Sequence, residues 1–271
     1  MRREWDEFSR HPFASMFRQI LPLLALLLSF AAGMAAEAKH TPHVFFMIGE
    51  TEYGTATTLP AFAKAELEPR GIRCTFSVLA SPTDEEFPNF DTLKDADLLF
   101  VSVRRHAPPK AQMDLIRAHV AAGKPVVGIR TASHAFGKRK GETEGAWENF
   151  DMEVLGGHYD NHYGRGVTTF AKIVPEAASH PVLTGISPVE FPVPSHLYKY
   201  PTLAPTATRL IAARMEGRPE IEPVAWVNVN GDRRAFYTSM GAAEDFEVPQ
   251  FRRLLLNGIH WALGLPVPPA K

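Results

Sequence analysis

The stretch GIRTASHAF, residues 128–136, places several reactive side chains directly after the apolar residues 125–127. An arginine guanidinium can fork two hydrogen bonds onto a carboxylate, a phosphate or a developing oxyanion, and it stays protonated in proteins. Histidine exchanges protons near neutral pH. The stretch therefore predicts a site that moves protons and stabilises negative charge, and its polar members are Arg130, Thr131, Ser133 and His134.

Two other apolar runs also end in polar side chains. The run at 43–48 is followed by Glu50, Glu52 and Tyr53, and the run at 97–103 is followed by Arg104, Arg105 and His106. Ligands of open α/β sheets bind beyond the carboxyl ends of the strands. Three charged strand ends therefore predict one site at this edge, where a glutamate could serve as a base if burial raises its pKa.

A glycine-flanked cluster at residues 156–164 contains His158, Tyr159 and His162. Histidines four apart on a helix share a face and can hold a metal ion, and His134 could complete such a set. The glycines favour a loop instead, in which the histidines form hydrogen bonds or face a substrate. A divalent metal held by these three histidines stays an open alternative.

Two further residues have two interpretations each. Tyr198 either lines a pocket or packs in the core. Asp245 either caps the helix that follows Pro249 or reaches the site, and capping is the simpler interpretation.

Apolar runs that alternate with helical patterns position these side chains. Such alternation implies right-handed crossovers and a parallel sheet. No internal repeat or linker is present, which indicates one domain. Strands are predicted at 43–48, 72–79, 97–103 and 125–129, helices at 59–67 and 112–121, then strands at 167–174, 209–213, 223–229 and 234–238, and a closing helix at 248–263.

The composition is that of an ordinary globular protein, with 271 residues, 45% of them hydrophobic and 22% charged. The formal net charge of -1 gives no support to binding of nucleic acid or of an anionic membrane. The one cysteine, Cys74, cannot form an internal disulfide and is expected to be a buried, inert thiol.

The N-terminal segment, residues 1–38, resembles a secretory signal peptide. Residues 17–36 have a basic flank at Arg18, a leucine-rich middle and small residues after it. Cleavage is expected between Ala35 and Lys39, and Met16 is an alternative start. We expect export to the periplasm or the exterior, with no stable membrane insertion after cleavage; an uncleaved segment would be a membrane anchor.

Five motifs together resemble the ThuA-like family, which is named for trehalose utilisation. They are GIRTASHAF, LGGHYDNHYG, HPVLTGI, EPVAWVNVNGDRRAFYTSMGAAEDF and FRRLLLNGIHWALG, in that order. The resemblance implies a ThuA-like domain over 43–264 and a proline-rich tail at 265–271. It also implies the fold of class I glutamine amidotransferases, a flavodoxin-like, doubly wound, mostly parallel sheet with helices on both faces.

The amidotransferase resemblance places Arg130 where those enzymes present a nucleophilic cysteine. An arginine cannot act as that nucleophile, so glutaminase activity is not expected. The elbow position would aim Arg130 into the cleft. The alternative is an internal ion pair of Arg130 with Glu50 or Glu52.

The family's link to trehalose implies an enzyme, a hydrolase or a lyase, that acts on a disaccharide or an oxidised (keto) sugar. The expected partner is a small carbohydrate, without nucleic acid or a required cofactor, and a homo-oligomer stays open. The catalytic residues that we predict are Arg130, His134, Glu50 and His162. Those predicted to bind substrate are Glu52, Tyr53, Arg104, Arg105, Thr131, Ser133, His158, Tyr159, Tyr198 and Asp245.

The sequence also departs from the family pattern. Many members carry histidine in the elbow, where this chain has Arg130, and a Gly-His pair before the closing helix, where it has Gly241 and Ala242. The missing histidine favours a first alternative, a non-catalytic module that binds a sugar or an anion. A metal-dependent hydrolase with histidine ligands is the second alternative.

Overall fold

The computed structural model describes residues 40–137, 145–219 and 221–270. The predicted signal peptide, residues 1–38, lies outside these ranges. All the elements named below belong to one unit, which begins at Thr41. Among the described residues, no helix combines the length and the apolar character needed to cross a membrane.

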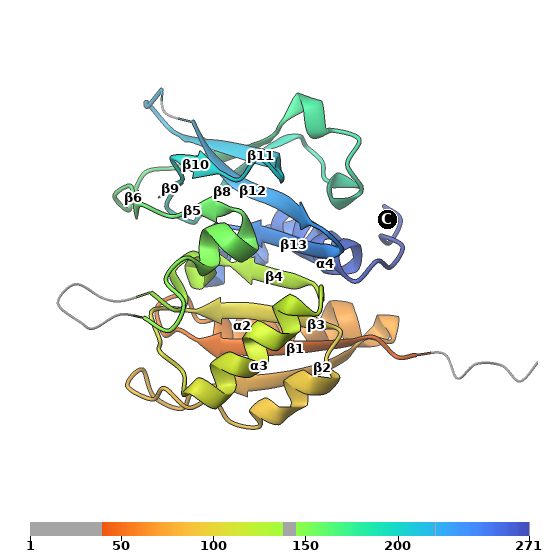
Figure 1. The fold of residues 1–271 in the computed structure, drawn as a ribbon. Helices are drawn as coiled ribbons and strands as arrows, with labels where there is room; N and C mark the ends of the chain where they lie inside the picture. Colours follow the sequence, from red (N-terminus) through yellow and green to blue (C-terminus); the bar gives the residue numbers. More distant parts are fainter. Residues whose placement is uncertain (1–39, 138–144, 220, 271) are drawn as a thin grey trace, which may run out of the picture. The chain divides into compact units, whose positions relative to one another are not determined.

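Five neighbouring strands form a parallel sheet in the order β2-β1-β3-β4-β13 (Figure 1). This is the strand order of a doubly wound, flavodoxin-like sheet, so the predicted fold class is confirmed. The strands are β1 (His43–Gly49), β2 (Arg73–Val78), β3 (Leu98–Val103), β4 (Val126–Ile129) and β13 (Arg233–Thr238).

Four antiparallel strands extend this sheet beyond β13, in the order β12-β11-β7-β8. The sequence analysis does not predict β8, which contains Pro192. An edge strand tolerates proline, since no neighbour needs its N–H group. The four strands are β12 (Ile221–Asn230), β11 (Ala207–Met215), β7 (Thr169–Ile173) and β8 (Glu190–Val193).

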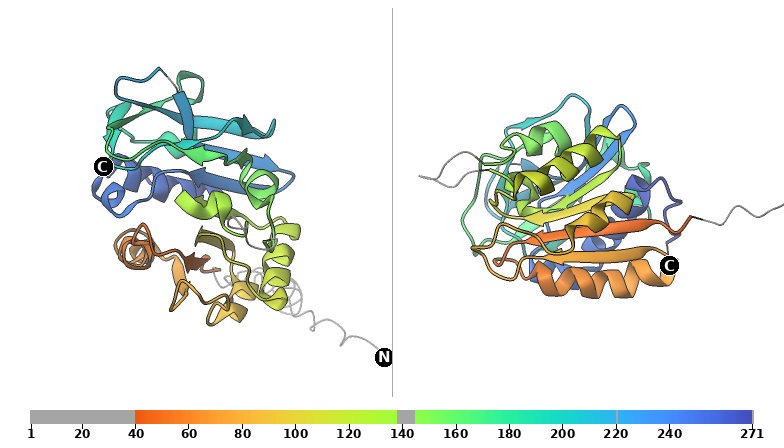
Figure 2. Two further views of the ribbon diagram at one scale, coloured as in Figure 1. Left: turned by 90° about the vertical axis from the view of Figure 1, so that its left-hand side faces the viewer. Right: turned by 60° about the horizontal axis from the view of Figure 1, so that its bottom comes forward.

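Helices cover both faces of the sheet, as Figures 1 and 2 show. Helix α3 (Lys110–Ala121) lies on one face, and α2 (Thr55–Phe62) and α4 (Pro249–Ala262) lie on the other. Helix α2 begins before the predicted start at 59 and continues as the π-helical segment η3 (Ala63–Leu67).

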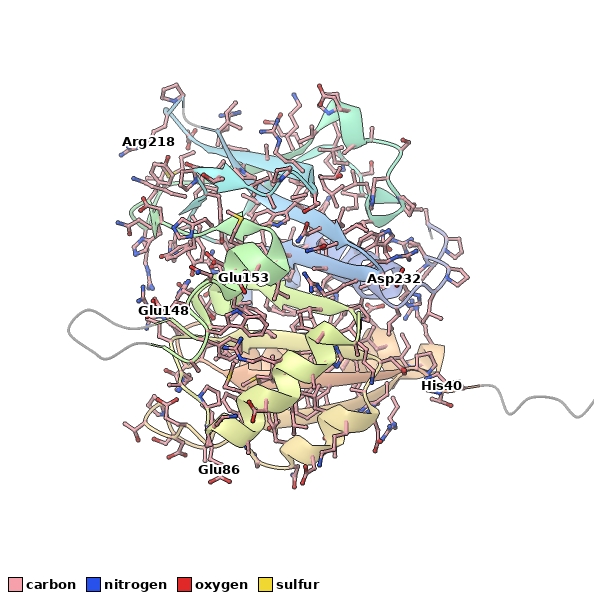
Figure 3. All side chains as sticks on the ribbon, in the orientation of Figure 1. His40, Glu86, Glu148, Glu153, Arg218 and Asp232 are labelled. Atoms are coloured by element: carbon pink, nitrogen blue, oxygen red, sulfur yellow. The ribbon has the colours of Figure 1, made fainter. Side chains whose placement is uncertain are left out.

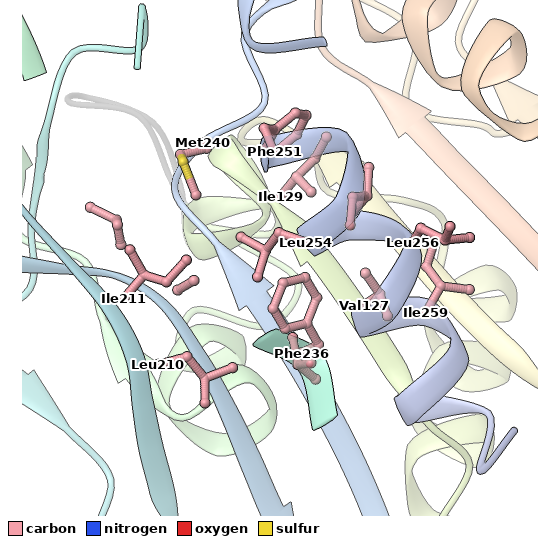
Figure 4. Close-up of a cluster of buried hydrophobic side chains, with 14 of the residues drawn as sticks. Val127, Ile129, Leu210, Ile211, Phe236, Met240, Phe251, Leu254, Leu256 and Ile259 are labelled. Atoms are coloured by element: carbon pink, nitrogen blue, oxygen red, sulfur yellow. The ribbon is translucent and has the colours of Figure 1, made fainter. Parts of the chain in front are cut away.

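Two hydrophobic cores lie against the two faces. In β1, alternate residues such as Phe46 and Ile48 join the core under α2 and α4, whereas Phe45 and Met47 join the core under α3. Figure 4 shows the first core, where Phe251, Leu254, Leu256 and Ile259 of α4 lie near Val127, Ile129 and Phe236. Charged side chains such as Glu86, Glu153, Arg218 and Asp232 remain on the surface (Figure 3).

The histidine-rich segment forms two very short strands instead of a plain loop. Strand β5 (Gly157–His158) pairs with β10 (Thr202–Leu203), and β6 (Asn161–His162) pairs with β9 (Tyr198–Lys199). The β6–β9 pairing places His162 opposite Tyr198. Short 3-10 and π segments are η4 (Glu68–Arg70), η5 (Phe90–Asp95), η6 (Arg130–His134), η7 (Asp151–Leu155), η8 (Pro175–Ala177), η9 (Pro181–Leu183) and η10 (Ala243–Glu247).

Candidate functional site

The turn from β4 into η6 has the sharp geometry of a strand-to-helix elbow. Arg130 has a φ of 47°, which lies in the left-handed region that side chains other than glycine rarely adopt. A Cβ atom on Gly128 would lie only 2.9 Å from the Cβ atom of Ala132. The elbow is therefore tight as well as strained, as is common where a fold presents a functional side chain.

The guanidinium of Arg130 is fully buried. It lies between the rings of Tyr53 and Tyr198, at 4.4 and 4.3 Å from their centroids. Its Nη1 atom donates to the carbonyls of His196 (3.0 Å) and Ser239 (2.6 Å). Two tyrosine rings and two carbonyls thus enclose this cation, which explains how a charge is tolerated at this depth.

Neither alternative for Arg130 describes this arrangement. The side chain does not face an open cleft, and among the described residues it forms no ion pair with Glu50 or Glu52. Its ligands come from the segment before Tyr198 and the end of β13, which local sequence patterns do not connect to the elbow.

His196 is a site residue that the sequence analysis does not select. Its ring lies next to Nη2 of Arg130, with Nδ1 at 3.0 Å, and meets the ring of His162 edge-on at 5.0 Å. Burial, followed by the charges of Arg130, His162 and Arg165, lowers the pKa of His196 to about 3. The imidazole is therefore neutral. The sequence signal that could have selected His196 is its position two residues before Tyr198, which is a predicted site residue.

His134 lies at the end of the elbow helix η6. Its ring stacks on Tyr159, with centroids 4.3 Å apart and planes at 26°, and Nδ1 lies 3.1 Å from Oγ of Ser133. Burial lowers the pKa of His134 well below its ordinary value, and the positive charges of Arg105 and Arg104 lower it further. The imidazole of His134 is therefore neutral at neutral pH and lies in the field of fixed positive charges.

Glu50 anchors the loop between β1 and α2. Its buried carboxylate accepts the N–H groups of Glu52 (2.8 Å), Tyr53 (2.7 Å) and Thr55 (2.9 Å), and it also accepts the hydroxyl of Thr55. Both carboxylate oxygens of Glu50 accept hydrogen bonds from this loop. Glu50 therefore holds in place the loop that carries Tyr53.

Glu52 joins two arginines at the rim of the site. It forms an ion pair with Arg104 at 3.3 Å and a second one with Arg165. The main chain of Arg105, which has a φ of 55°, donates its N–H group to the carbonyl of His134 at 3.0 Å. These contacts tie the loops after β1 and β3 to the elbow, as the strand-end argument predicts.

His158 and His162 have different neighbours. His158 is exposed and pairs with Asp151 at 3.2 Å, whereas Nδ1 of His162 lies 2.8 Å from the carbonyl of Tyr163. Burial raises the pKa of Asp151. Within the described ranges, no group of three His, Cys, Asp or Glu side chains is arranged to hold a metal ion, so His134, His158 and His162 do not form the metal site that the sequence left as an alternative.

Asp245 stabilises the loop after β13 and does not cap α4. Its fully buried carboxylate accepts the N–H groups of Gly241 (2.6 Å), Ala242 (2.9 Å) and Ser195 (3.1 Å). Helix α4 starts after Val248 without a side-chain cap. Asp245 thereby holds the segment that delivers His196 to Arg130.

Three more of the predicted binding residues are buried. Tyr198 donates its hydroxyl to that of Tyr53 at 3.2 Å. Ser133 donates to the carbonyl of Arg130 at 3.2 Å, and Thr131 is fully buried, with no hydrogen-bond partner for its hydroxyl among the described residues. These side chains build the wall of the site, whereas Tyr159 and His134 are only partly buried.

Comparisons with solved structures agree with this fold. The chain is similar to a ThuA-like protein from Parabacteroides merdae (TM-score 0.58, 14% identity, 86% of this chain and 94% of that one). It is also similar to the "mmIFT52 N-terminal domain" (TM-score 0.51, 10% identity, 81% and 96%). A third structure, "Agd3 a novel carbohydrate deacetylase", matches with a TM-score of 0.51 and 11% identity over 83% of this chain but 32% of that one.

A search of curated protein sequences finds no match. The family model described as "ThuA: Trehalose utilisation" matches residues 44–262. This range contains the whole parallel sheet apart from His43, together with the elbow and α4. The chain therefore belongs to the ThuA family, and this membership suggests a role in carbohydrate utilisation.

Proposed function

We propose that this chain is an exported enzyme that acts on a disaccharide or an oxidised (keto) sugar and uses His134 as its base. The family described as trehalose utilisation supports the substrate class. The residues around the elbow support the chemistry. A relative in fold that is described as a carbohydrate deacetylase is in keeping with a sugar substrate, although its likeness concerns the fold alone.

The observation that carries the proposal is the environment of His134. The imidazole is held neutral by burial and by nearby arginines, and its ring orientation is set by stacking on Tyr159. A base of this kind can remove the proton from a carbon next to a keto group, and the electron pair of that C–H bond then forms an enolate. Arg104 and Arg105 would stabilise the negative charge on the enolate oxygen.

Arg130 has a supporting role in this proposal. Because its guanidinium is enclosed by Tyr53, Tyr198 and two carbonyls, it organises the wall of the site. His162, at the exposed rim beside His196, is the second candidate for proton transfer.

The experiment is to incubate the full-length protein with disaccharides, their keto derivatives and sugar acids in heavy water. Product formation or deuterium uptake next to the keto group, followed by NMR, supports the proposal. His134→Gln should abolish it. His180→Gln is the matched control. The side chain of His180 contacts the N–H group of Val182 and the ring of Trp261, neither of which belongs to the proposed site. Turnover that survives in His134→Gln would refute the assignment of the base.

A non-catalytic sugar- or anion-binding module is the second candidate. The observation in its favour is Ala242, which is buried where many family members carry histidine. Binding of a sugar without any change in that sugar, measured by calorimetry and then by NMR of the recovered ligand, would favour the module. Metal analysis of the purified protein tests the metal-dependent hydrolase in the same preparation.

Export is tested separately from catalysis. Cell fractionation followed by N-terminal sequencing should find a mature chain that starts between Ala35 and Lys39. A full-length chain in the membrane fraction would instead indicate an uncleaved anchor.

A further inference from the structure

The hydroxyl of Ser133 lies near the hydroxyls of Tyr200 and Tyr237 and has two further polar neighbours at the elbow. Its Oγ atom is 3.2 Å from the carbonyl oxygen of Arg130 and 3.1 Å from Nδ1 of His134. Ser133 is buried, so no bulk water competes for these contacts. The sequence analysis treats this serine as a substrate contact, but the structure turns it toward the protein.

The carbonyl of Arg130 fixes the direction of its bond to Ser133. A serine hydroxyl carries one hydrogen and two lone pairs, and a carbonyl oxygen can only accept. The hydroxyl of Ser133 donates to the carbonyl of Arg130, and with its hydrogen used there its oxygen accepts from Nδ1 of His134. That arrangement requires the hydrogen of neutral His134 to reside on Nδ1.

Two buried tyrosines belong to the same cluster of hydroxyls. The hydroxyl of Tyr237 donates to the same carbonyl of Arg130 at 2.6 Å, and the hydroxyl of Tyr200 lies 2.5 Å from that of Tyr237. Because the hydrogen of Tyr237 is used on the carbonyl, the oxygen of Tyr237 is left to accept from Tyr200. The hydroxyls of this cluster are thus ordered around one acceptor.

We propose that Ser133 is a positioning residue that holds His134 in the Nδ1–H tautomer and leaves the lone pair of Nε2 free to accept a proton. None of the described residues hydrogen-bonds to Nε2. The stack on Tyr159 fixes the plane of the ring, and the bond to Ser133 fixes which nitrogen is the base. The catalytic consequence rests on the proposed function, whereas the tautomer itself does not.

The tautomer is measured by two-bond ¹H–¹⁵N NMR on the ¹⁵N-labelled full-length protein at neutral pH. The signals of His134 are those absent from His134→Gln. We expect Nδ1 to carry the hydrogen in the wild type and Nε2 to carry it in Ser133→Ala, because free imidazole favours that tautomer. Thr131→Val is the control, since its hydroxyl is buried on the same short helix and forms no hydrogen bond with any described residue, and it should keep the wild-type tautomer.

Turnover adds a second measurement. Ser133→Ala should lower kcat by about tenfold through loss of one orienting hydrogen bond, and Ser133→Thr, which keeps the hydroxyl, should recover most of it. A wild type with hydrogen on Nε2 overturns the inference, even if sugar is turned over. The Nδ1–H tautomer in a protein that turns over no sugar refutes the proposed function and leaves the inference standing.

Discussion

At the scale of single residues, Arg130 shows how a fold stabilises a buried charge when none of the described residues forms an ion pair with it. Its cation is balanced by the faces of Tyr53 and Tyr198 and by the carbonyls of His196 and Ser239. Removal of this side chain would leave two buried carbonyls without a donor and a gap between two rings, so its main contribution is to the stability of the wall.

Arg130→Ala should therefore lower the free energy of unfolding by about 3–5 kcal/mol, from lost cation–π contacts and unsatisfied carbonyls. Urea titration followed by circular dichroism measures this change. The control is Arg218→Ala, because Arg218 is exposed at the surface and its loss should change stability little. Equal stabilities of the two variants would show that the enclosed cation contributes nothing to the fold.

The proposed function makes the activity depend on the protonation state of His134. Burial and the charges of Arg105 and Arg104 lower its pKa, so the neutral base persists when the pH falls below 6.5, the ordinary value. We expect kcat/KM to stay on its plateau through that pH and to decline only in more acidic solution. Arg104→Gln removes one positive charge and should shift the decline toward higher pH. A midpoint near 6.5 in the wild type would contradict this account.

At the scale of elements, the site depends on three loops that meet at one edge of the sheet. Parallel strands bring their carboxyl ends together, and backbone bonds then fix the loops to each other. The N–H group of Arg104 donates to the carbonyl of Gly49, and that of His106 donates to the carbonyl of Ala135. The elbow, the loop after β1 and the loop after β3 are thus one connected structure.

Helix α4 offers a test of packing against helix propensity. Glycine to alanine inside a helix normally stabilises it by up to about 1 kcal/mol. At Gly258, however, an added Cβ atom would lie 2.4 Å from Cδ1 of Phe236 on β13. We expect Gly258→Ala to lower the free energy of unfolding by about 1–3 kcal/mol, because the helix must move off the sheet.

Thermal denaturation measures this effect. Gly164→Ala is the control, since no atom lies within 4 Å of the position of its added Cβ. A more stable Gly258→Ala protein would mean that α4 packs less closely on the sheet than the structure shows.

At the scale of the whole molecule, several histidines are buried in a neutral form. Burial, opposed by a hydrogen bond to the carbonyl of Pro125, lowers the pKa of His119 to about 4, and burial with nearby positive charge lowers that of His196 to about 3. In the unfolded chain these groups bind protons near pH 6.5. Between about pH 4 and pH 6.5, the unfolded state therefore binds more protons than the native state.

The free energy of unfolding should consequently be highest above about pH 7 and should decrease as the pH drops through 6.5 toward 4. For His119 alone the loss amounts to about 3 kcal/mol at the acid end. Unfolding free energies measured across this range test the prediction, and His119→Gln should show a shallower decline than the wild type. A stability that rises on acidification to pH 5 would reverse the sign argued here.

The parallel half of the fold could be predicted from the sequence, since its strands are apolar runs with helices between them. The short strands β5, β6, β9 and β10 could not be predicted, because a strand of two residues is too short to show an alternation of apolar and polar side chains. The gathering of charged strand ends could be predicted as well, from the direction of parallel strands.

By itself, the sequence determined the family, the parallel sheet and the edge of the sheet at which the candidate residues gather. Only the tertiary structure decided what each polar side chain contacts. The partners of Arg130 lie 66 and 109 residues away along the chain, and Asp245 meets Ser195 across 50 residues. Local patterns record whether a residue is apolar, whereas the partner of a buried charge depends on which distant segments the fold brings together.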